Sequence, residues 1–265
     1  MRAILSCLAA ALLAVAVPAL AQEQTPAPMS PGGMSSGMSS PFSEAERAAL
    51  HAEIRAYLLA NPEVLTEMIQ LLEQKQQAAT AENDRGLVAT NADEIFDDGF
   101  SWVGGTPEGS FTLVEFLDYQ CGFCKRAQPD VVELLGSDGD IRLIVKEMPI
   151  LGPGSELAAR AAVATMVTEG AEQYAALHEK LISIEGGITD VSLDQALGEV
   201  GLDPVAVRAA MQDPEVDRRL GATRGLAEKL AIAGTPTFVF DNQMVRGYLP
   251  LDAMRSLVGE VRASD

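Results

Sequence analysis

The chain has 265 residues, of which 48% are hydrophobic, and its formal net charge is −19 at pH 7. An apolar share of this size supports one sizeable core, and the strong acidity argues against nucleic acids and anionic membrane surfaces as partners. Only three cysteines and two histidines are present, so few residues are available for redox chemistry or for binding soft metals.

Residues 1–21 have the pattern of a secretory signal peptide. Arg2 supplies the positive start, an apolar run follows, and a small-x-small cleavage site ends it. Cys7 lies inside this peptide and would be lost with it, which leaves Cys121 and Cys124 in the mature protein. We therefore expect a periplasmic protein whose two cysteines lie in an oxidising compartment, where disulfides persist.

Residues 22–42 are rich in glycine, serine and proline, so we expect a flexible linker. Met29, Met34 and Met38 recur within it. Spaced thioethers can bind Cu(I), because soft sulfur suits a soft metal. The alternative is that methionine is simply tolerated in a disordered tail.

Two helices are expected over residues 43–92. Ser43 and Glu46 have the spacing of a capping box, and Asn61-Pro62 separates the helices. Each helix carries an apolar stripe that so short a segment cannot bury alone, so we expect homo-oligomerisation through this segment. The alternative is docking on the main domain of the same chain. The stripe residues are Leu50, Ile54 and Leu58 in the first helix, and Leu65, Met68 and Leu72 in the second.

A main domain is expected over residues 96–262, with a helical insertion over about 153–233. The order of strands and helices predicts an α/β fold with a mixed central sheet flanked by helices. Ser192 and Gln195 have capping-box spacing inside the insertion. The other predicted elements are, in chain order, a strand over 111–119, a helix ending at Gly136, a strand over 141–150, a hairpin over 237–247 and a helix over 251–261.

The motif Cys121-Gly122-Phe123-Cys124 is compatible with three roles: a metal site, a structural disulfide or a redox pair. A zinc site needs four ligands, and the only histidines, His51 and His178, lie near no second cysteine pair, so we expect no metal. A disulfide that closes so short a loop removes little entropy from the unfolded chain. A helix N-terminus stabilises a thiolate, so we expect Cys121 to attack disulfides and Cys124 to resolve the mixed disulfide.

This motif after a strand, together with Gly234-Thr235-Pro236-Thr237 before a later strand, resembles the DsbA-like thioredoxin-fold oxidoreductases. The phrases "VEFLDYQCGFCK" and "KEMPILGPGS" resemble the ScsC- and Com1-type branch of that family. The resemblance implies a thioredoxin fold, a redox-active Cys121–Cys124 disulfide and no cofactor. It also implies a cis peptide bond before Pro236, with backbone groups of Thr235 facing a bound peptide, and an N-terminal segment that favours a trimer over a dimer.

The resemblance also favours one direction of chemistry. Gly122 and Phe123 replace the Pro-His of the oxidase DsbA, and Thr235 before the proline is like the isomerase DsbC. We expect an isomerase or reductase that acts on unfolded or misfolded exported proteins, with a membrane redox partner. Gly122 and Phe123 would line the substrate groove. A DsbA-like oxidase is the first alternative, and a chaperone or Cu(I)-binding protein is an alternative of another class.

Glu115 lies ahead of the cysteines, where the resemblance places a buried acid. Burial raises the pKa of a carboxyl group, so Glu115 is expected to carry a proton to or from Cys124. The alternative is an ion pair between Glu115 and Lys146. Asp118 and Tyr119 either shape the groove or serve only as loop residues.

Overall fold

The computed structural model describes residues 42–264. The expected signal peptide, Cys7, and Met29, Met34 and Met38 lie outside the described residues. The chain divides into two units between Pro62 and Glu63. The expected boundary, between residues 92 and 96, differs from this division.

The described part of the first unit is built around helix α1 (Glu44–Ala60). Its start is the expected capping box: the Ser43 hydroxyl accepts from the backbone N–H of Glu46, and the Ser43 N–H donates to Glu46 Oε2 at 2.7 Å. Asn61 ends the helix, with its side-chain amide donating to the Tyr57 carbonyl at 2.8 Å. None of the α1 residues is buried, so its apolar stripe is open to solvent.

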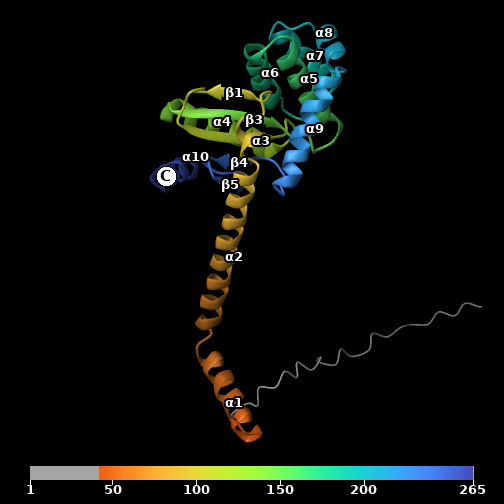
Figure 1. Ribbon diagram of the computed structural model, residues 1–265. Coiled ribbons are helices and arrows are strands. Elements are labelled where there is room, and N and C mark those ends of the chain that lie inside the picture. Colours follow the sequence, from red (N-terminus) through yellow and green to blue (C-terminus); the bar gives the residue numbers. More distant parts are fainter. Residues whose placement is uncertain (1–41, 265) are drawn as a thin grey trace, which may run out of the picture. The chain divides into compact units, whose positions relative to one another are not determined.

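The second unit contains a five-stranded sheet with strand order β1-β3-β2-β4-β5 (Figure 1). Strands β2 and β3 are parallel, and every other neighbouring pair is antiparallel, so the sheet is mixed as expected. The strands are β1 (Trp102–Gly105), β2 (Phe111–Leu117), β3 (Ile141–Glu147), β4 (Thr237–Phe240) and β5 (Gln243–Arg246). The helices are α2 (Glu63–Thr90), α3 (Ala92–Phe96), α4 (Gly122–Asp138), α5 (Pro153–Thr168), α6 (Ala171–Ser183), α7 (Asp190–Glu199), α8 (Pro204–Ala210), α9 (Pro214–Lys229) and α10 (Leu251–Ser264).

The two faces of the sheet have separate apolar cores. Successive side chains of β2 point to opposite faces, so Leu113 and Leu117 join the core shared with α4 and α10. Val114 and Phe116 join the other core, which α3, α9 and the end of α2 cover. Glu115 therefore lies on the α4 face, which is the face that carries the cysteines.

The last turns of α2 belong to this second core. Val88 is 3% exposed and lies in one cluster with Phe116, and the buried Asp84 forms an ion pair with Arg246 of β5, with Nη2 and Oδ1 3.0 Å apart. These two are the only α2 residues that the described structure buries. The stripe of Leu65, Met68 and Leu72 is exposed.

Five helices, α5 to α9, form the expected insertion between β3 and β4. The capping box predicted at Ser192 and Gln195 is wrong by one turn. Thr189 is the N-cap of α7, and Ser192 is its reciprocal partner, because a serine hydroxyl can accept from the N-cap backbone as glutamate or glutamine does.

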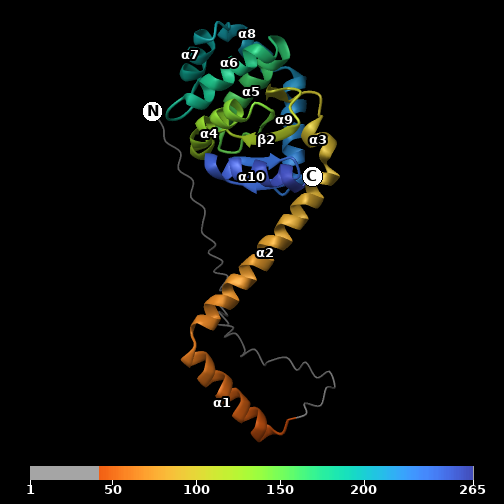
Figure 2. The ribbon, with the colours of Figure 1, turned by 90° about the vertical axis from the view of Figure 1, so that its left-hand side faces the viewer.

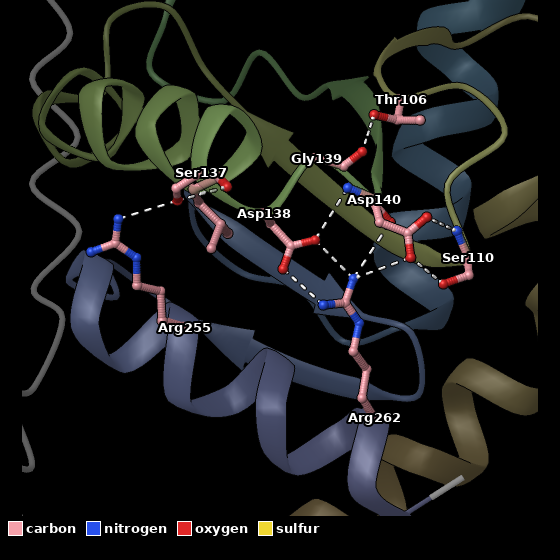
Figure 3. A network of polar contacts seen from close by, with 9 residues as sticks. Thr106, Ser110, Ser137, Asp138, Gly139, Asp140, Arg255 and Arg262 are labelled. Atoms are coloured by element: carbon pink, nitrogen blue, oxygen red, sulfur yellow. Dashed lines mark hydrogen bonds and ion pairs between the residues drawn. The ribbon is translucent and has the colours of Figure 1, made fainter.

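Helix α10 packs against α4, and Arg255 and Arg262 of α10 form polar contacts with the end of α4 (Figure 3). Arg262 donates to both carboxylate oxygens of Asp138, each at 2.8 Å, and its Nη2 lies 3.6 Å from Asp140 Oδ2. Helix α4 ends at Asp138 rather than at the predicted Gly136, because Gly139 takes the left-handed conformation of a C-cap, with φ 75°.

Candidate functional site

Helix α4 follows β2 in the chain, and both elements are labelled in Figure 2. The two cysteines lie at the N-terminal end of α4. Cys121 is the N-cap of α4, and Cys124 lies in its first turn. Both are free thiols, so the structure shows the dithiol form. Cys121 is 6% exposed and Cys124 is 0% exposed. This order of exposure fits an attacking Cys121 and a resolving Cys124.

The loop ahead of β4 lies against Cys121. The Thr235–Pro236 peptide bond is cis, as expected, and the Cys121 thiol donates to the Thr235 carbonyl at 3.1 Å. Thr237 fixes this loop by donating its hydroxyl to the Gly234 carbonyl at 2.8 Å. Thr235 Oγ1 is buried and has no hydrogen-bond partner among the described residues. The Thr235 carbonyl is the group of this loop that lies beside the thiol.

Asp118 holds the loop that carries Cys121. Its Oδ1 accepts from the N–H of Gln120 at 2.8 Å, and its Oδ2 accepts from the N–H groups of Ile150 and Leu151 at 2.8 and 3.0 Å. Its own carbonyl accepts from the N–H of Cys121 at 3.0 Å. Of the two roles considered for Asp118, the geometry supports shaping of the site, because one buried side chain ties the cysteine loop to the β3–α5 loop.

Glu115 and Cys124 are buried on the same face of the sheet and influence each other. Burial raises the pKa of Glu115 to about 8, and the nearby charge of Glu147 adds to the effect. Burial also raises the pKa of the Cys124 thiol well above its usual range, and the charge of Glu115 contributes. A buried acid that still holds its proton near neutral pH can give that proton to a thiolate.

Lys146 does not pair with Glu115. Its ammonium group donates to Asp98 Oδ2 at 2.5 Å and to the Glu94 carbonyl at 2.9 Å. Lys146 and Glu115 point to opposite faces of the sheet, since Glu115 is paired in register with Val145. The ion-pair alternative for Glu115 is therefore wrong.

A buried polar cluster that sequence reasoning missed lies next to the site. Glu147 Oε1 accepts from the hydroxyls of Tyr119 and Tyr174 at 2.7 and 2.5 Å, and Tyr119 Oη lies 3.0 Å from His178 Nδ1. The rings of Trp102 and Tyr174 stack with centroids 5.5 Å apart. Tyr119 was a candidate groove residue, but its partners on β3 and α6 were not predictable from chain position alone.

Exposed apolar side chains lie between the two cysteines and in the β3–α5 loop that Asp118 binds. Phe123 is 56% exposed, and Ile150 and Leu151 are 42% and 50% exposed. The Arg126 guanidinium lies over the rings of Phe123 and Tyr248, 5.5 and 5.8 Å from their centroids. Gly122 is exposed too, and a side chain added there would meet nothing within 4 Å. Both residues between the cysteines thus face outward.

Two further observations concern the described residues only. Residues 42–264 contain no group of three or more histidine, cysteine or acidic side chains placed to hold a metal ion. Among the helices described, none combines the length and the apolar character needed to cross a membrane.

Several solved structures have folds similar to that of this chain. A thioredoxin-like oxidoreductase from Silicibacter pomeroyi is 37% identical with a TM-score of 0.62, and the match covers 65% of this chain and 98% of that one. A periplasmic thioredoxin-like protein from Salmonella enterica serovar Typhimurium is 31% identical with a TM-score of 0.59, over 64% of this chain and 94% of that one.

Curated relatives match about three fifths of this chain. The Na⁺/H⁺ antiporter NhaA 3 of Salinispora tropica is 28% identical, and the match covers 61% of this chain. The chain spans only 25% of the length of that antiporter. Disulfide bond formation protein D of Bacillus subtilis is 23% identical over 59% of this chain and 74% of that protein.

Family comparisons match two separate regions of the chain, and the first of them crosses the division between the two units of the fold. The Copper resistance protein ScsC N-terminal domain matches residues 46–79, which lie in α1 and α2. The DSBA-like thioredoxin domain matches residues 112–259, which is more than half of the chain and includes both cysteines and the cis-proline loop. The chain therefore belongs to the DsbA-like thioredoxin-domain family of thiol-disulfide oxidoreductases.

Proposed function

We propose that this protein is a periplasmic disulfide isomerase or reductase that acts on unfolded or misfolded exported proteins. The observation that carries the proposal is the placement of Cys121 at the N-terminus of α4, 3.1 Å from the Thr235 carbonyl and directly ahead of the buried Cys124. A helix N-terminus favours the thiolate, which is the attacking species in disulfide exchange.

The chemistry runs in two steps. The Cys121 thiolate attacks a substrate disulfide, forms a mixed disulfide and releases the other substrate sulfur as a thiolate. In reduction, Cys124 then loses its proton to the Glu115 carboxylate and attacks Cys121 Sγ, which expels the second substrate thiolate and leaves the Cys121–Cys124 disulfide. In isomerisation, a substrate thiolate attacks the mixed disulfide instead, and the Cys121 thiolate is regenerated.

Three features support isomerisation or reduction over oxidation. Gly122 and Phe123 place no histidine beside Cys121, so a thiolate-stabilising group of the oxidase type is missing from the motif. Thr235 precedes the cis-proline, as in the isomerase DsbC that the motif resembles, and its carbonyl lies beside the Cys121 thiol. The exposed apolar side chains of Phe123, Ile150 and Leu151 offer contact area to unfolded chains.

We also propose that the chain forms a homo-oligomer through α1 and the first turns of α2, with a trimer favoured over a dimer. The support is the exposure of every α1 residue, the exposed stripe on α2 and the match of residues 46–79 to the N-terminal domain of ScsC. Several thiols on one particle raise the local concentration around a misfolded substrate.

Two assays test the direction of electron flow. The wild-type protein and Cys121→Ser are compared in refolding of scrambled ribonuclease and in reduction of insulin by glutathione. Wild type is expected to accelerate both, and Cys121→Ser neither. Faster oxidation of reduced ribonuclease, without any gain in scrambled refolding, would instead support the DsbA-like oxidase, whose partner would be a membrane reoxidant.

The alternative of another class is a chaperone or a Cu(I)-binding protein. The match to a domain of a copper resistance protein supports the test for copper. The double variant Cys121→Ser, Cys124→Ser separates the two ideas. Cu(I) binding that survives in this variant would point to Met29, Met34 and Met38, which lie outside the described residues. Suppression of aggregation by the same variant would identify a chaperone.

A further inference from the structure

Two buried carboxylates lie on one face of the sheet beside the resolving cysteine. In the parallel pairing of β2 and β3, Glu115 is opposite Val145, and Leu117 is opposite Glu147. Glu115 and Glu147 are therefore diagonal neighbours on adjacent strands, with both side chains on the α4 face. Glu115 is 2% exposed and Glu147 is 6% exposed.

No described basic side chain forms an ion pair with either carboxylate. Lys146, which lies between Val145 and Glu147 on β3, pairs with Asp98 on the other face. Arg219 of α9 lines the same cavity as Glu147, but its guanidinium bonds Glu215 and the Phe100 carbonyl. Two like charges this well buried cannot both be ionised without a large cost, so the pair shares its protons.

We propose that Glu115 and Glu147 act as one proton-binding pair that serves Cys124, and that Glu147 is the positioning residue which sets the pH range over which Glu115 exchanges its proton with that thiol. This inference rests on the proposed dithiol function. It concerns Glu147, which lies on β3, 23 positions after Cys124, and is not part of the cysteine motif.

The surroundings of the two carboxyl groups differ, and this difference sets the order in which they lose their protons as pH rises. Burial raises the pKa of Glu147 to about 7, while hydrogen bonds from Tyr174 and Tyr119 favour its ionised form. Among the described residues Glu115 has no such donor, and burial with the charge of Glu147 raises its pKa to about 8. Near neutral pH the hydrogen-bonded Glu147 therefore carries the larger share of the pair's negative charge, and Glu115 the larger share of its proton.

The tyrosines and His178 that face Glu147 favour this order, whereas the charge of Asp118 opposes it by raising the pKa of Glu147. Burial lowers the pKa of His178 to about 4, so its ring is neutral near pH 7, and burial raises the pKa values of both tyrosine hydroxyls well above their usual range. The titratable and charged groups around Glu147 are Glu115 of β2, Asp118 and Tyr119 of the loop after it, Tyr174 and His178 of α6, and Arg219 of α9.

Glu147 also lines a cavity that is large enough for a water molecule. Its Oε2 is buried and has no partner among the described residues, and Glu147 lines a cavity of about 20 Å³ together with Trp102, Tyr174 and Arg219. A cavity of this size holds about one water molecule. Proton exchange between the buried pair and solvent can run through this site without opening the core.

The proton balance of the resolving step follows. When a substrate thiolate attacks Cys121 Sγ of the Cys121–Cys124 disulfide, that S–S bond breaks, a mixed disulfide forms, and the Cys124 thiolate takes the proton of Glu115. In the reverse step, the Glu115 carboxylate takes the proton of the Cys124 thiol, and the resulting thiolate attacks Cys121 Sγ and expels the substrate sulfur.

The test isolates the Cys124 step with 5,5′-dithiobis(2-nitrobenzoic acid). Cys121 of the reduced protein attacks this disulfide and releases one thionitrobenzoate, and Cys124 then releases the second from the mixed disulfide. Stopped-flow absorbance from pH 5 to 10 gives the pH midpoint of the second phase. That midpoint reports deprotonation of the Glu115 and Cys124 unit, whereas the first phase reports Cys121.

Glu147→Gln keeps an oxygen for the tyrosine hydroxyls but removes the charge. Its second-phase midpoint is expected to fall by about one pH unit, because one like charge near Glu115 is gone. The control Glu179→Gln removes an exposed acid of α6 and should leave the midpoint unchanged. An unshifted midpoint in Glu147→Gln overturns the pair, while absence of any second phase in the wild type overturns the dithiol function itself.

Tyr174→Phe provides a second variant that keeps both carboxylates. It removes one donor that favours ionised Glu147, so Glu147 holds its proton to higher pH and the second-phase midpoint falls by less than in Glu147→Gln. Carbon-13 carboxyl titration of reduced Tyr174→Phe should show the Glu147 midpoint moving up and the Glu115 midpoint moving down. Movement of both midpoints in one direction, or of neither, overturns the proposal even where Glu147→Gln does not fold.

Discussion

Cys121 and Cys124 differ in exposure, and burial raises the pKa of the Cys124 thiol; both observations bear on the order of their reactions. Cys121 has a small exposed area at the end of a helix, whereas Cys124 is wholly buried, and burial raises the pKa of its thiol. N-ethylmaleimide should therefore modify Cys121 of the reduced protein at least about tenfold faster than Cys124 at pH 7.

Peptide mass spectrometry after timed quenching measures this order. Cys124→Ser should be labelled at the wild-type rate, since its reactive Cys121 is intact. Earlier labelling of Cys124 would reverse the assigned roles.

Glu115 makes a second prediction possible, about stability and pH. Its folded-state pKa is raised above the unfolded value, so the folded protein binds more protons than the unfolded chain between about pH 4.5 and about pH 8. This contribution lowers stability as pH rises through that window. Glu115→Gln, which cannot ionise, should be more stable than wild type by on the order of a few kcal/mol at pH 8 and nearly equal to it at pH 4.5.

Urea unfolding of the reduced proteins across this pH range measures the difference. The same variant should slow the Cys124 step, because the nearest proton acceptor is gone. A stability difference that stays constant with pH would show that Glu115 is not titrating in the folded state.

At the scale of elements, α10 is held to α4 by charge as well as by its apolar face. Arg262 makes a two-bond pair with Asp138 and lies over the ring of Phe111, 5.2 Å from its centroid. The guanidinium of Arg262 holds the pKa of Asp138 below its usual range. The stabilisation from this pair is thus present above the unfolded pKa of Asp138 and lost as pH falls through the folded one.

Arg262→Ala should lower the free energy of unfolding by about 1 kcal/mol at low salt, and by less in 1 M salt, because the pair is partly exposed and screened. Arg255→Ala, on the same helix, is the matched control. Its contacts to Glu133 and Ser137 are longer and more exposed, so its effect should be smaller. Thermal unfolding at two salt concentrations measures both. Equal losses in the two variants would contradict a specific contribution of the Arg262–Asp138 pair.

The sequence predicted most of these elements, because their signals are local. The hydrophobic strands β2 and β3, and the helices that begin with proline after Asp203 and Asp213, need only neighbouring residues. Helix ends were less predictable. Gly136 and Gly139 are both glycines near the end of α4, and only the packing of the last turn against α10 decides between them.

The site divides in the same way. Cys121, Cys124, Thr235 and Pro236 belong to short motifs, and each lies where the motifs placed it. Glu147 was not predicted. Its importance depends on a parallel pairing of β2 and β3 and on tyrosines from two further elements, which no short stretch of sequence encodes.

At the scale of the whole molecule, the two ends of α2 have different roles. Its last turns are part of the catalytic domain core through Val88 and Asp84, while its earlier turns carry the exposed stripe that we assign to oligomerisation. A truncation that removes the stripe must therefore spare the end of the helix.

A chain starting at Thr80 keeps Asp84 and Val88 and should be monomeric, retain dithiol chemistry and lose most isomerase activity. The full chain should be a homo-oligomer by light scattering and active with scrambled ribonuclease. A monomeric full chain would contradict the assembly, and equal isomerase activity in both forms would contradict its role. A chain starting at Asp93 should in addition melt several degrees lower, because it loses buried Val88 and the Asp84–Arg246 pair.

The open space around Gly122 allows the residues between the two cysteines to be replaced. Gly122 is the first residue of α4, a position that proline suits, and a new side chain there would meet no neighbour. Phe123 beside it points mostly to solvent. Selection can therefore exchange the two residues between the cysteines without repacking the core, so that one scaffold can move between oxidising and isomerising chemistry through two surface substitutions.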